Sequence, residues 1–121
     1  MSTRTFRIIV RGFFDGLSPE QRAALQADAA QHDVFNAAFT PEGSLTYDIA
    51  ARDAFTFRFQ DTGEDEEDIL LATEQAEENA AAWLTERGYG YKNLRSTAQD
   101  LSMAPLGKRQ RREAQRRETT R

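Results

Sequence analysis

The chain has 121 residues, of which 39% are hydrophobic, 30% charged and 10% aromatic, and it contains no cysteine. This length and composition predict one domain with a modest core, and they exclude a wholly disordered chain. The lack of cysteine excludes disulfides, thiolate metal sites and cysteine nucleophiles. No apolar stretch reaches the ~18 residues of a membrane helix, so we expect a cytoplasmic protein with no membrane partner.

The first predicted element is a half-buried strand. Phe6, Ile8 and Val10 alternate with Arg7, Ile9 and Arg11, and such alternation places the apolar set toward a core and the other set on the opposite face. Ser18, followed by Pro, Glu and Gln, then predicts the start of a helix closed by a capping box. We expect this helix to run to about His32. Residues 34–39 predict a short extra strand.

The middle of the chain predicts a β-hairpin and the next part a long helix. Two alternating runs flank a turn at 51–53, and their apolar members are Leu45, Tyr47, Ile49, Phe55, Phe57 and Phe59. Residues 65–87 contain neither Pro nor Gly and carry apolar residues at helical spacing. Five acidic residues, 64–68, stand at the expected helix N-terminus, and Gly88 follows its end. Residues 91–98 predict a last strand.

This β-α-β-β-α-β order predicts an α+β ferredoxin-like sandwich: an antiparallel sheet with both helices on one face and its first and third strands in the centre. We assign residues 1–103 to this domain. Residues 104–121 begin with a segment that contains Pro105 and Gly107, and we expect them to form a basic tail that is disordered or a frayed helix.

The charge is divided between the predicted domain and the tail. Residues 1–107 hold nine basic and 18 acidic side chains, a formal charge of −9, whereas residues 108–121 hold seven basic and two acidic ones, a charge of +5. An acidic body with a basic tail is typical of proteins that contact an anionic partner through the tail.

Several long runs carry a resemblance to a known family: RGFFDGLS, AAFTPEGSLTYDIAAR, FTFRF, AAWLTERGYGYKNLRS and SMAPLGKR. They resemble a family of small uncharacterised actinobacterial proteins, known only as a domain of unknown function. The resemblance extends from Thr3 to about Arg112. It implies a single domain in a bacterial cytoplasm, and it implies no activity, cofactor or catalytic residue.

The predicted open face of the sheet is the first candidate site. Arg7, Arg11 and Arg58 share this face on strands that we expect to be neighbours, and like charges on neighbouring strands are destabilising unless an anion or acid compensates them. Asp48 is one candidate compensator, and an anionic ligand is another; a solvated charged face is the simpler interpretation. The phenylalanines are expected to face the core, so base stacking as in RNA-recognition modules is not predicted.

The basic tail is the second candidate site for an anionic partner, nucleic acid or ribosome. Its candidate contacts are Lys108, Arg109, Arg111, Arg112, Arg116 and Arg117. A solubilising tail, or one docked on the acids 64–68 of its own or a neighbouring chain, is the simpler interpretation. Self-association as a homodimer through the open face or a sheet edge is also predicted.

An enzyme remains the alternative class. A small-ligand-binding or oxygenase-like enzyme of the dimeric α+β barrel type would hold a small molecule between sheet and helices. The residues expected to line that pocket are His32, Asn36, Tyr47, Phe57 and Trp83, although the aromatic members are more simply core residues. With a single histidine and no cysteine, the sequence predicts no metal, no cofactor and no catalytic residue. The favoured function is therefore a non-catalytic interaction module.

Overall fold

The computed structural model describes residues 3–101, so the basic tail and the predicted domain boundary at 103 lie outside the described residues. Four strands, two α-helices and two short 3-10 turns follow one another along the chain. In order they are β1 (Arg4–Asp15), α1 (Pro19–Ala27), η1 (Ala29–His32), η2 (Val34–Asn36), β2 (Ser44–Tyr47), β3 (Ala54–Gly63), α2 (Asp68–Glu86) and β4 (Gly90–Asp100).

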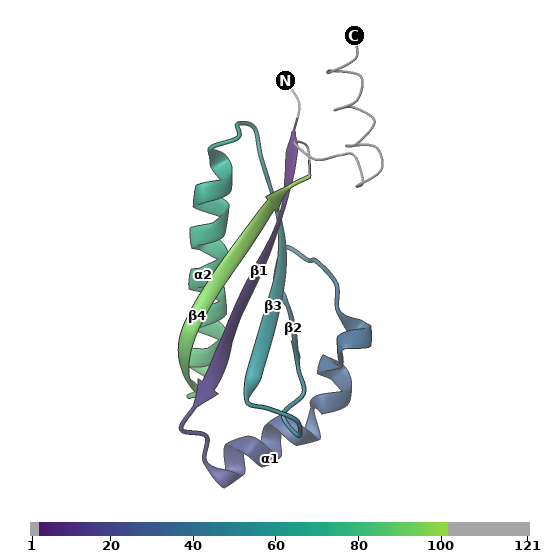
Figure 1. The fold of residues 1–121 in the computed structure, drawn as a ribbon, viewed down its shortest axis with the longest axis vertical. Coiled ribbons are helices and arrows are strands. Elements are labelled where there is room, and N and C mark those ends of the chain that lie inside the picture. The colour runs from purple at the N-terminus through teal and green to yellow at the C-terminus, as the bar shows by residue number, and fades with distance from the viewer. Residues whose placement is uncertain (1–2, 102–121) are drawn as a thin grey trace, which may run out of the picture.

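The strands form one antiparallel sheet in the order β2-β3-β1-β4. The first and third strands therefore lie side by side in its centre, as expected from the sequence. Figure 1 shows the long β1 and β3 crossing the middle of the molecule, with α2 on their left and partly behind β4. The fold is thus α+β with an open four-stranded sheet, which has one face toward α2 and one face free of it.

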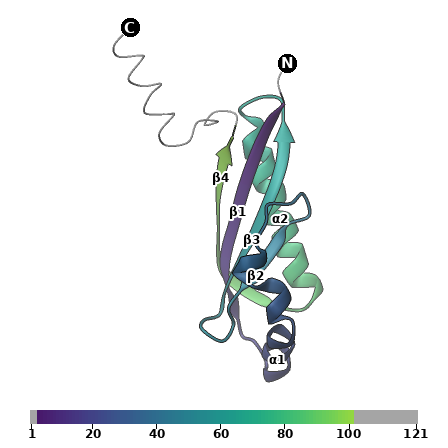
Figure 2. The ribbon, with the colours of Figure 1, turned by 90° about the vertical axis from the view of Figure 1, so that its right-hand side faces the viewer.

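The core lies between the sheet and α2. Phe6, Ile8 and Val10 are fully buried, which confirms the predicted phase of β1. The three phenylalanines of β3 also face inward, and they meet one side of α2, whose buried residues are Ala72, Ala76, Ala80 and Leu84. Small alanines on this helix allow close approach to the large rings of the sheet. Figure 2 shows α2 lying along this face of the sheet.

The first helix is placed differently from the expectation. Its capping box is confirmed: the Ser18 hydroxyl accepts from the backbone N–H of Gln21, and the Gln21 side chain accepts from that of Ser18. The helix, however, lies beyond one end of the strands rather than beside α2 (Figure 1). Only Leu25 of α1 is buried, so a short helix with a single core residue closes the end of the core.

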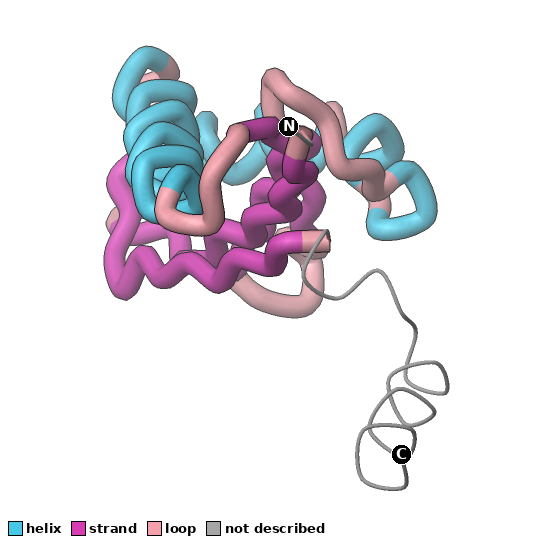
Figure 3. Tube along the Cα trace, turned by 90° about the horizontal axis from the view of Figure 1, so that it is seen from above, coloured by secondary structure: helices cyan, strands magenta, loops and turns pink. Residues whose placement is uncertain are grey.

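Two boundaries in the α1–β2 connection were predicted wrongly. The first helix ends at Ala27, and the chain continues to His32 as a 3-10 turn. Residues 34–39 do not form a strand, because Val34–Asn36 is a second 3-10 turn whose start is capped by Asp33. The Asp33 carboxylate accepts from the backbone N–H of Phe35 at 2.9 Å. Figure 3 shows α2 and these 3-10 turns on opposite sides of the molecule.

The second helix begins three residues later than expected, at Asp68. The Asp68 carboxylate accepts from the backbone N–H groups of Glu64 and Asp65, at 2.9 and 3.0 Å, and so closes the turn before the helix. At the other end Gly88 adopts a φ of 76°, which confirms the predicted stop. Within residues 3–101, no helix is long and apolar enough to cross a membrane.

Candidate functional site

A row of polar side chains crosses the open face of the sheet. Strand register places Arg11 of β1 opposite Thr56 of β3 on one side and opposite Arg95 of β4 on the other. Thr56 is in turn opposite Thr46 of β2. Arg58 lies two residues further along β3 and shares this face. Three arginines from three neighbouring strands are thus held close together by backbone pairing alone.

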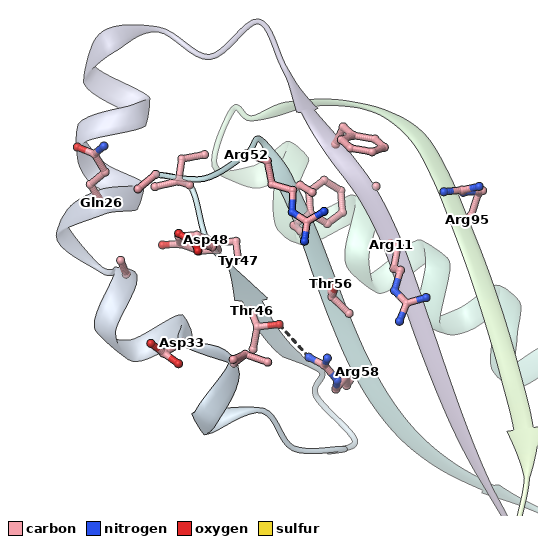
Figure 4. Close-up of a pocket in the computed structure, with 18 residues that line it drawn as sticks. Arg11, Gln26, Asp33, Thr46, Tyr47, Asp48, Arg52, Thr56, Arg58 and Arg95 are labelled. Carbon is pink, nitrogen blue, oxygen red and sulfur yellow. Dashed lines mark hydrogen bonds between the residues drawn. The ribbon is translucent and has the colours of Figure 1, made fainter.

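These side chains line a half-open concavity of about 810 Å³, which we call the arginine pocket. The sheet forms its floor, and the segment from the end of α1 to η2 borders it at the β2 edge (Figure 4). A fourth arginine, Arg52, comes from the turn between β2 and β3. The polar and charged residues that line the pocket are Arg11, Gln26, Asp33, Thr46, Asp48, Arg52, Thr56, Arg58 and Arg95.

No carboxylate within residues 3–101 forms an ion pair with an arginine of the pocket. The ion pairs of this region are Arg4–Asp100, Arg22–Asp53, Arg87–Glu86 and Lys92–Asp15. The expectation that Asp48 would compensate one of the arginines is therefore wrong for the described residues: Asp48 lines the pocket but is ion-paired to none of them. Within the part of the chain that the structure describes, the four arginines of the pocket therefore have no ion-paired carboxylate.

Arg58 is the most constrained of the four arginines. Its Nη1 donates to the Thr46 hydroxyl at 2.8 Å, a contact drawn in Figure 4, and the Thr46 residue is buried. Partial burial, and then the nearby charge of Arg11, lowers the pKa of Arg58. A guanidinium nevertheless stays protonated in proteins. Arg58 is therefore a fixed cation in a site that is partly shielded from water, where an anion is held more strongly than at an exposed surface.

Three hydrogen bonds between two pairs of residues join α1, whose end borders the pocket, to the β2–β3 hairpin. Arg22 of α1 grips Asp53 with two hydrogen bonds of 2.8 and 3.0 Å. The Tyr47 hydroxyl donates to the carbonyl of Leu25 at 2.6 Å. Burial, more than any neighbouring charge, raises the pKa of Tyr47 to about 12, so this hydroxyl keeps its proton over the physiological range. The pocket is a built feature of the fold rather than a chance gap beside a loop.

Of the three arginines predicted from the sequence, two line the pocket and one does not. Arg11 and Arg58 are brought together, whereas Arg7 is engaged elsewhere on the same face. Its Nε donates to the side chain of Gln60 at 3.4 Å, and its guanidinium lies 4.8 Å from the centre of the Phe39 ring. Arg7 therefore has two protein partners outside the arginine pocket.

Sequence reasoning missed Arg52 and Arg95. The alternation of β4 is broken at Asn93, which has a φ of 56° where the pairing with β1 shifts register. Such a bulge puts the residues before and after it out of phase, so a simple period of two cannot assign Arg95 to a face. Arg52 lies in a turn, where the alternation of strands carries no information about direction.

The residues of the enzyme alternative are divided between separate places. His32 stacks on Tyr47 with ring centres 5.1 Å apart, and its Nδ1 is 3.0 Å from the carbonyl oxygen of Leu45. Phe57 is buried and meets the edge of Trp83. Asn36 is exposed and donates to the carbonyl of Ala30. Of the five, Tyr47 alone lines the arginine pocket. No set of three or more histidine, aspartate or glutamate side chains within residues 3–101 is arranged to hold a metal ion.

The fold and the pocket together define a small α+β domain with an arginine-lined open sheet face. The chain belongs to a family of unknown function, DUF6204, whose model matches residues 1–112. This confirms the resemblance seen in the sequence, and the match includes Lys108, Arg109, Arg111 and Arg112 of the basic tail. No curated protein and no solved structure matches the chain.

Proposed function

We propose that this protein is a non-catalytic interaction module that binds an anionic group in the arginine pocket. The observation that carries the proposal is the meeting of Arg11, Arg52, Arg58 and Arg95 around one concavity with no ion-paired carboxylate among the described residues. Like charges so placed destabilise a sheet. A bound anion would remove that cost, and guanidinium groups with nearby hydroxyls are well suited to oxyanions.

We also propose that the domain has a ferredoxin-like fold. We further propose that it works in the cytoplasm of a bacterium, and more narrowly of an actinobacterium. The strand order with β1 and β3 in the centre supports the fold class. The position of α1 beyond the end of the strands is a departure from that class. The long runs shared with a family of small actinobacterial proteins support the setting.

The basic tail provides a second proposed contact, with nucleic acid or ribosome, and the open face or a sheet edge a proposed contact with a second copy of the chain. The seven basic residues between 108 and 121 support the former. Comparing RNA binding of the full chain with that of a chain ended at Gly107 tests it, because equal binding would remove the tail from the interaction. Light scattering tests self-association.

The anion proposal is tested by calorimetric titration of the full chain with inorganic phosphate. We expect Arg11→Gln and Arg58→Gln each to weaken binding about tenfold, since each loses a charge-assisted hydrogen bond. Arg7→Gln is the matched control: it removes the same charge from the same face at a residue that already has partners. Equal affinity of all three variants and the parent chain would show that phosphate binds elsewhere and would refute the proposal.

A further inference from the structure

The arginine pocket has two chemically different sides. Figure 4 shows Asp33 and Asp48 on the side of the α1–η2 segment, and Arg11, Arg58 and Arg95 across β2 from them. Resting on the proposed function, we infer that the ligand of the pocket is a small phosphate monoester whose organic part carries hydroxyl or amino groups. A polyanion, such as a nucleic-acid strand, is not the partner that this face selects.

The arginine side favours a phosphate over a single carboxylate. A carboxylate offers two oxygens in one plane, which a single guanidinium can satisfy. Here guanidinium groups come from β1, β3 and β4 and from the β2–β3 turn, and Thr56 adds a hydroxyl in the same row. A phosphate monoester presents three free oxygens in different directions and carries close to two negative charges at neutral pH. It therefore matches several separate donors and offsets more of their charge.

The carboxylate side sets what the rest of the ligand can be. Asp33 uses one oxygen, Oδ1, to cap the 3-10 turn η2, and its other oxygen makes no protein hydrogen bond that the described structure contains. Asp48 forms no side-chain ion pair with the described residues, although it borders the pocket. Ionised carboxylates accept hydrogen bonds and repel anions. Hydroxyl or amino groups are thus accepted on this side, and a second phosphate is rejected.

The size of the pocket leaves room for such an organic part. Its volume of about 810 Å³ falls in the range of roughly 300–1,000 Å³ that is usual for small-molecule sites. Apolar surface is available at its border, where Val34 is 60% exposed and Phe13 36% exposed. An inorganic anion would occupy only the arginine side.

The negative charge of the whole domain disfavours the binding of a polyanion more than that of a small anion. Residues 3–101 hold nine basic and 18 acidic side chains, a formal charge of −9. A long polyanion extends beyond the pocket and meets this negative field, whereas a small anion interacts mainly with the local arginines. The charge layout thus agrees with the two-sided chemistry of the pocket.

The experiment is a calorimetric titration of the full chain with three probes: inorganic phosphate, phenyl phosphate and adenosine monophosphate. We expect adenosine monophosphate, which has hydroxyl and amino groups, to bind about tenfold more tightly than the other two. Asp33→Asn with Asp48→Asn should remove this advantage and strengthen the binding of inorganic phosphate, because two carboxylates that repel it are neutralised. The asparagine at 33 retains a side-chain oxygen for the cap of η2. Arg11→Gln should weaken the binding of all three probes.

The outcomes separate the inference from the proposal on which it rests. If the three probes bind equally and Arg11→Gln weakens all of them, the anion site stands and the inferred ligand class is wrong. If single-stranded RNA binds more tightly than adenosine monophosphate in a manner that requires Arg11, the inference is also overturned in favour of a polyanion. If no probe shows binding that depends on Arg11, the proposed function itself fails.

Discussion

Replacing Arg11 by glutamine should make the protein more stable, although it removes a residue that we place in the binding site. Arg11 is directly opposite Arg95 in the register of β1 and β4, and its charge is close enough to Arg58 to lower the pKa of that residue. A pair of like charges on opposite residues costs about 0.2–1 kcal/mol. Relief of both contacts predicts a gain in the free energy of unfolding of about 0.5–1 kcal/mol.

Thermal unfolding followed by circular dichroism at low ionic strength measures this gain. A domain of this size changes its melting temperature by roughly 4–8 °C per kcal/mol, so the variant should melt about 2–8 °C higher. Added salt should reduce the difference in melting temperature between the variant and the parent chain, because screening weakens the repulsion that the substitution removes. Phosphate should raise the melting temperature of the parent chain more than that of the variant, since a ligand stabilises the state that binds it.

Arg7→Gln serves as the control for this measurement. It lowers the charge of the same face by the same amount, but Arg7 contacts Gln60 and the Phe39 ring rather than another arginine. We expect it to leave the stability unchanged or slightly reduced. The reasoning is refuted if Arg11→Gln melts at or below the temperature of the parent chain at low salt, or if Arg7→Gln stabilises equally.

Three further predictions concern the frame that holds the pocket. Tyr47→Phe should lower the free energy of unfolding by about 1–3 kcal/mol, measured by urea titration, because the carbonyl of Leu25 loses its donor. Gly43→Ala should destabilise by more than about 1 kcal/mol in the same assay, since Gly43 has a φ of 93° and an added Cβ would overlap the ring of Phe59. Hydrogen bonds from two backbone N–H groups lower the pKa of Asp68. The Asp68 carboxylate therefore contributes its full stabilisation above its pKa in the unfolded chain, which is about 4. This stabilisation is lost as the pH falls through the lower pKa of the folded chain. Asp68→Ala should accordingly be less stable than the parent chain at neutral pH, and acid titration of both should show this difference closing below about pH 4; a difference that does not change with pH would contradict the account.

The sequence predicts best where one face of an element meets the core and the other meets solvent. The inward direction of Phe6, Ile8 and Val10 follows from strict alternation, and burial of these side chains confirms it. The capping box of Ser18 and Gln21 was predictable because its two hydrogen bonds depend only on residues three apart. In both cases the information is local in the chain.

The errors arise where contacts between distant segments decide the structure. The connection after α1 is anchored by Tyr47 and by His32, which lies against the carbonyl of Leu45, and not by its own alternation. The pattern of residues 34–39 therefore predicts a strand, whereas the structure has a 3-10 turn at Val34–Asn36. Arg95 was missed for a related reason, since the bulge at Asn93 is set by pairing with β1. Two of the four arginines of the pocket, Arg52 and Arg95, could thus not be predicted from the sequence.

The placement of acids argues that the arginine pocket is more than a solvated face. Residues 3–101 hold twice as many acidic as basic side chains, so carboxylates for neutralising four arginines are abundant. They are used elsewhere: Asp53 holds Arg22 and Asp100 holds Arg4, both at sites that join elements of the fold. The two acids that border the pocket, Asp33 and Asp48, stand on the side of β2 away from the arginines of β1 and β4. A face selected only for solubility would gain stability by pairing these charges, since like charges on neighbouring strands are unfavourable. Keeping the arginines and the acids apart lowers stability, and it leaves a cationic side and an anionic side facing one space, an arrangement that suits a ligand with complementary groups.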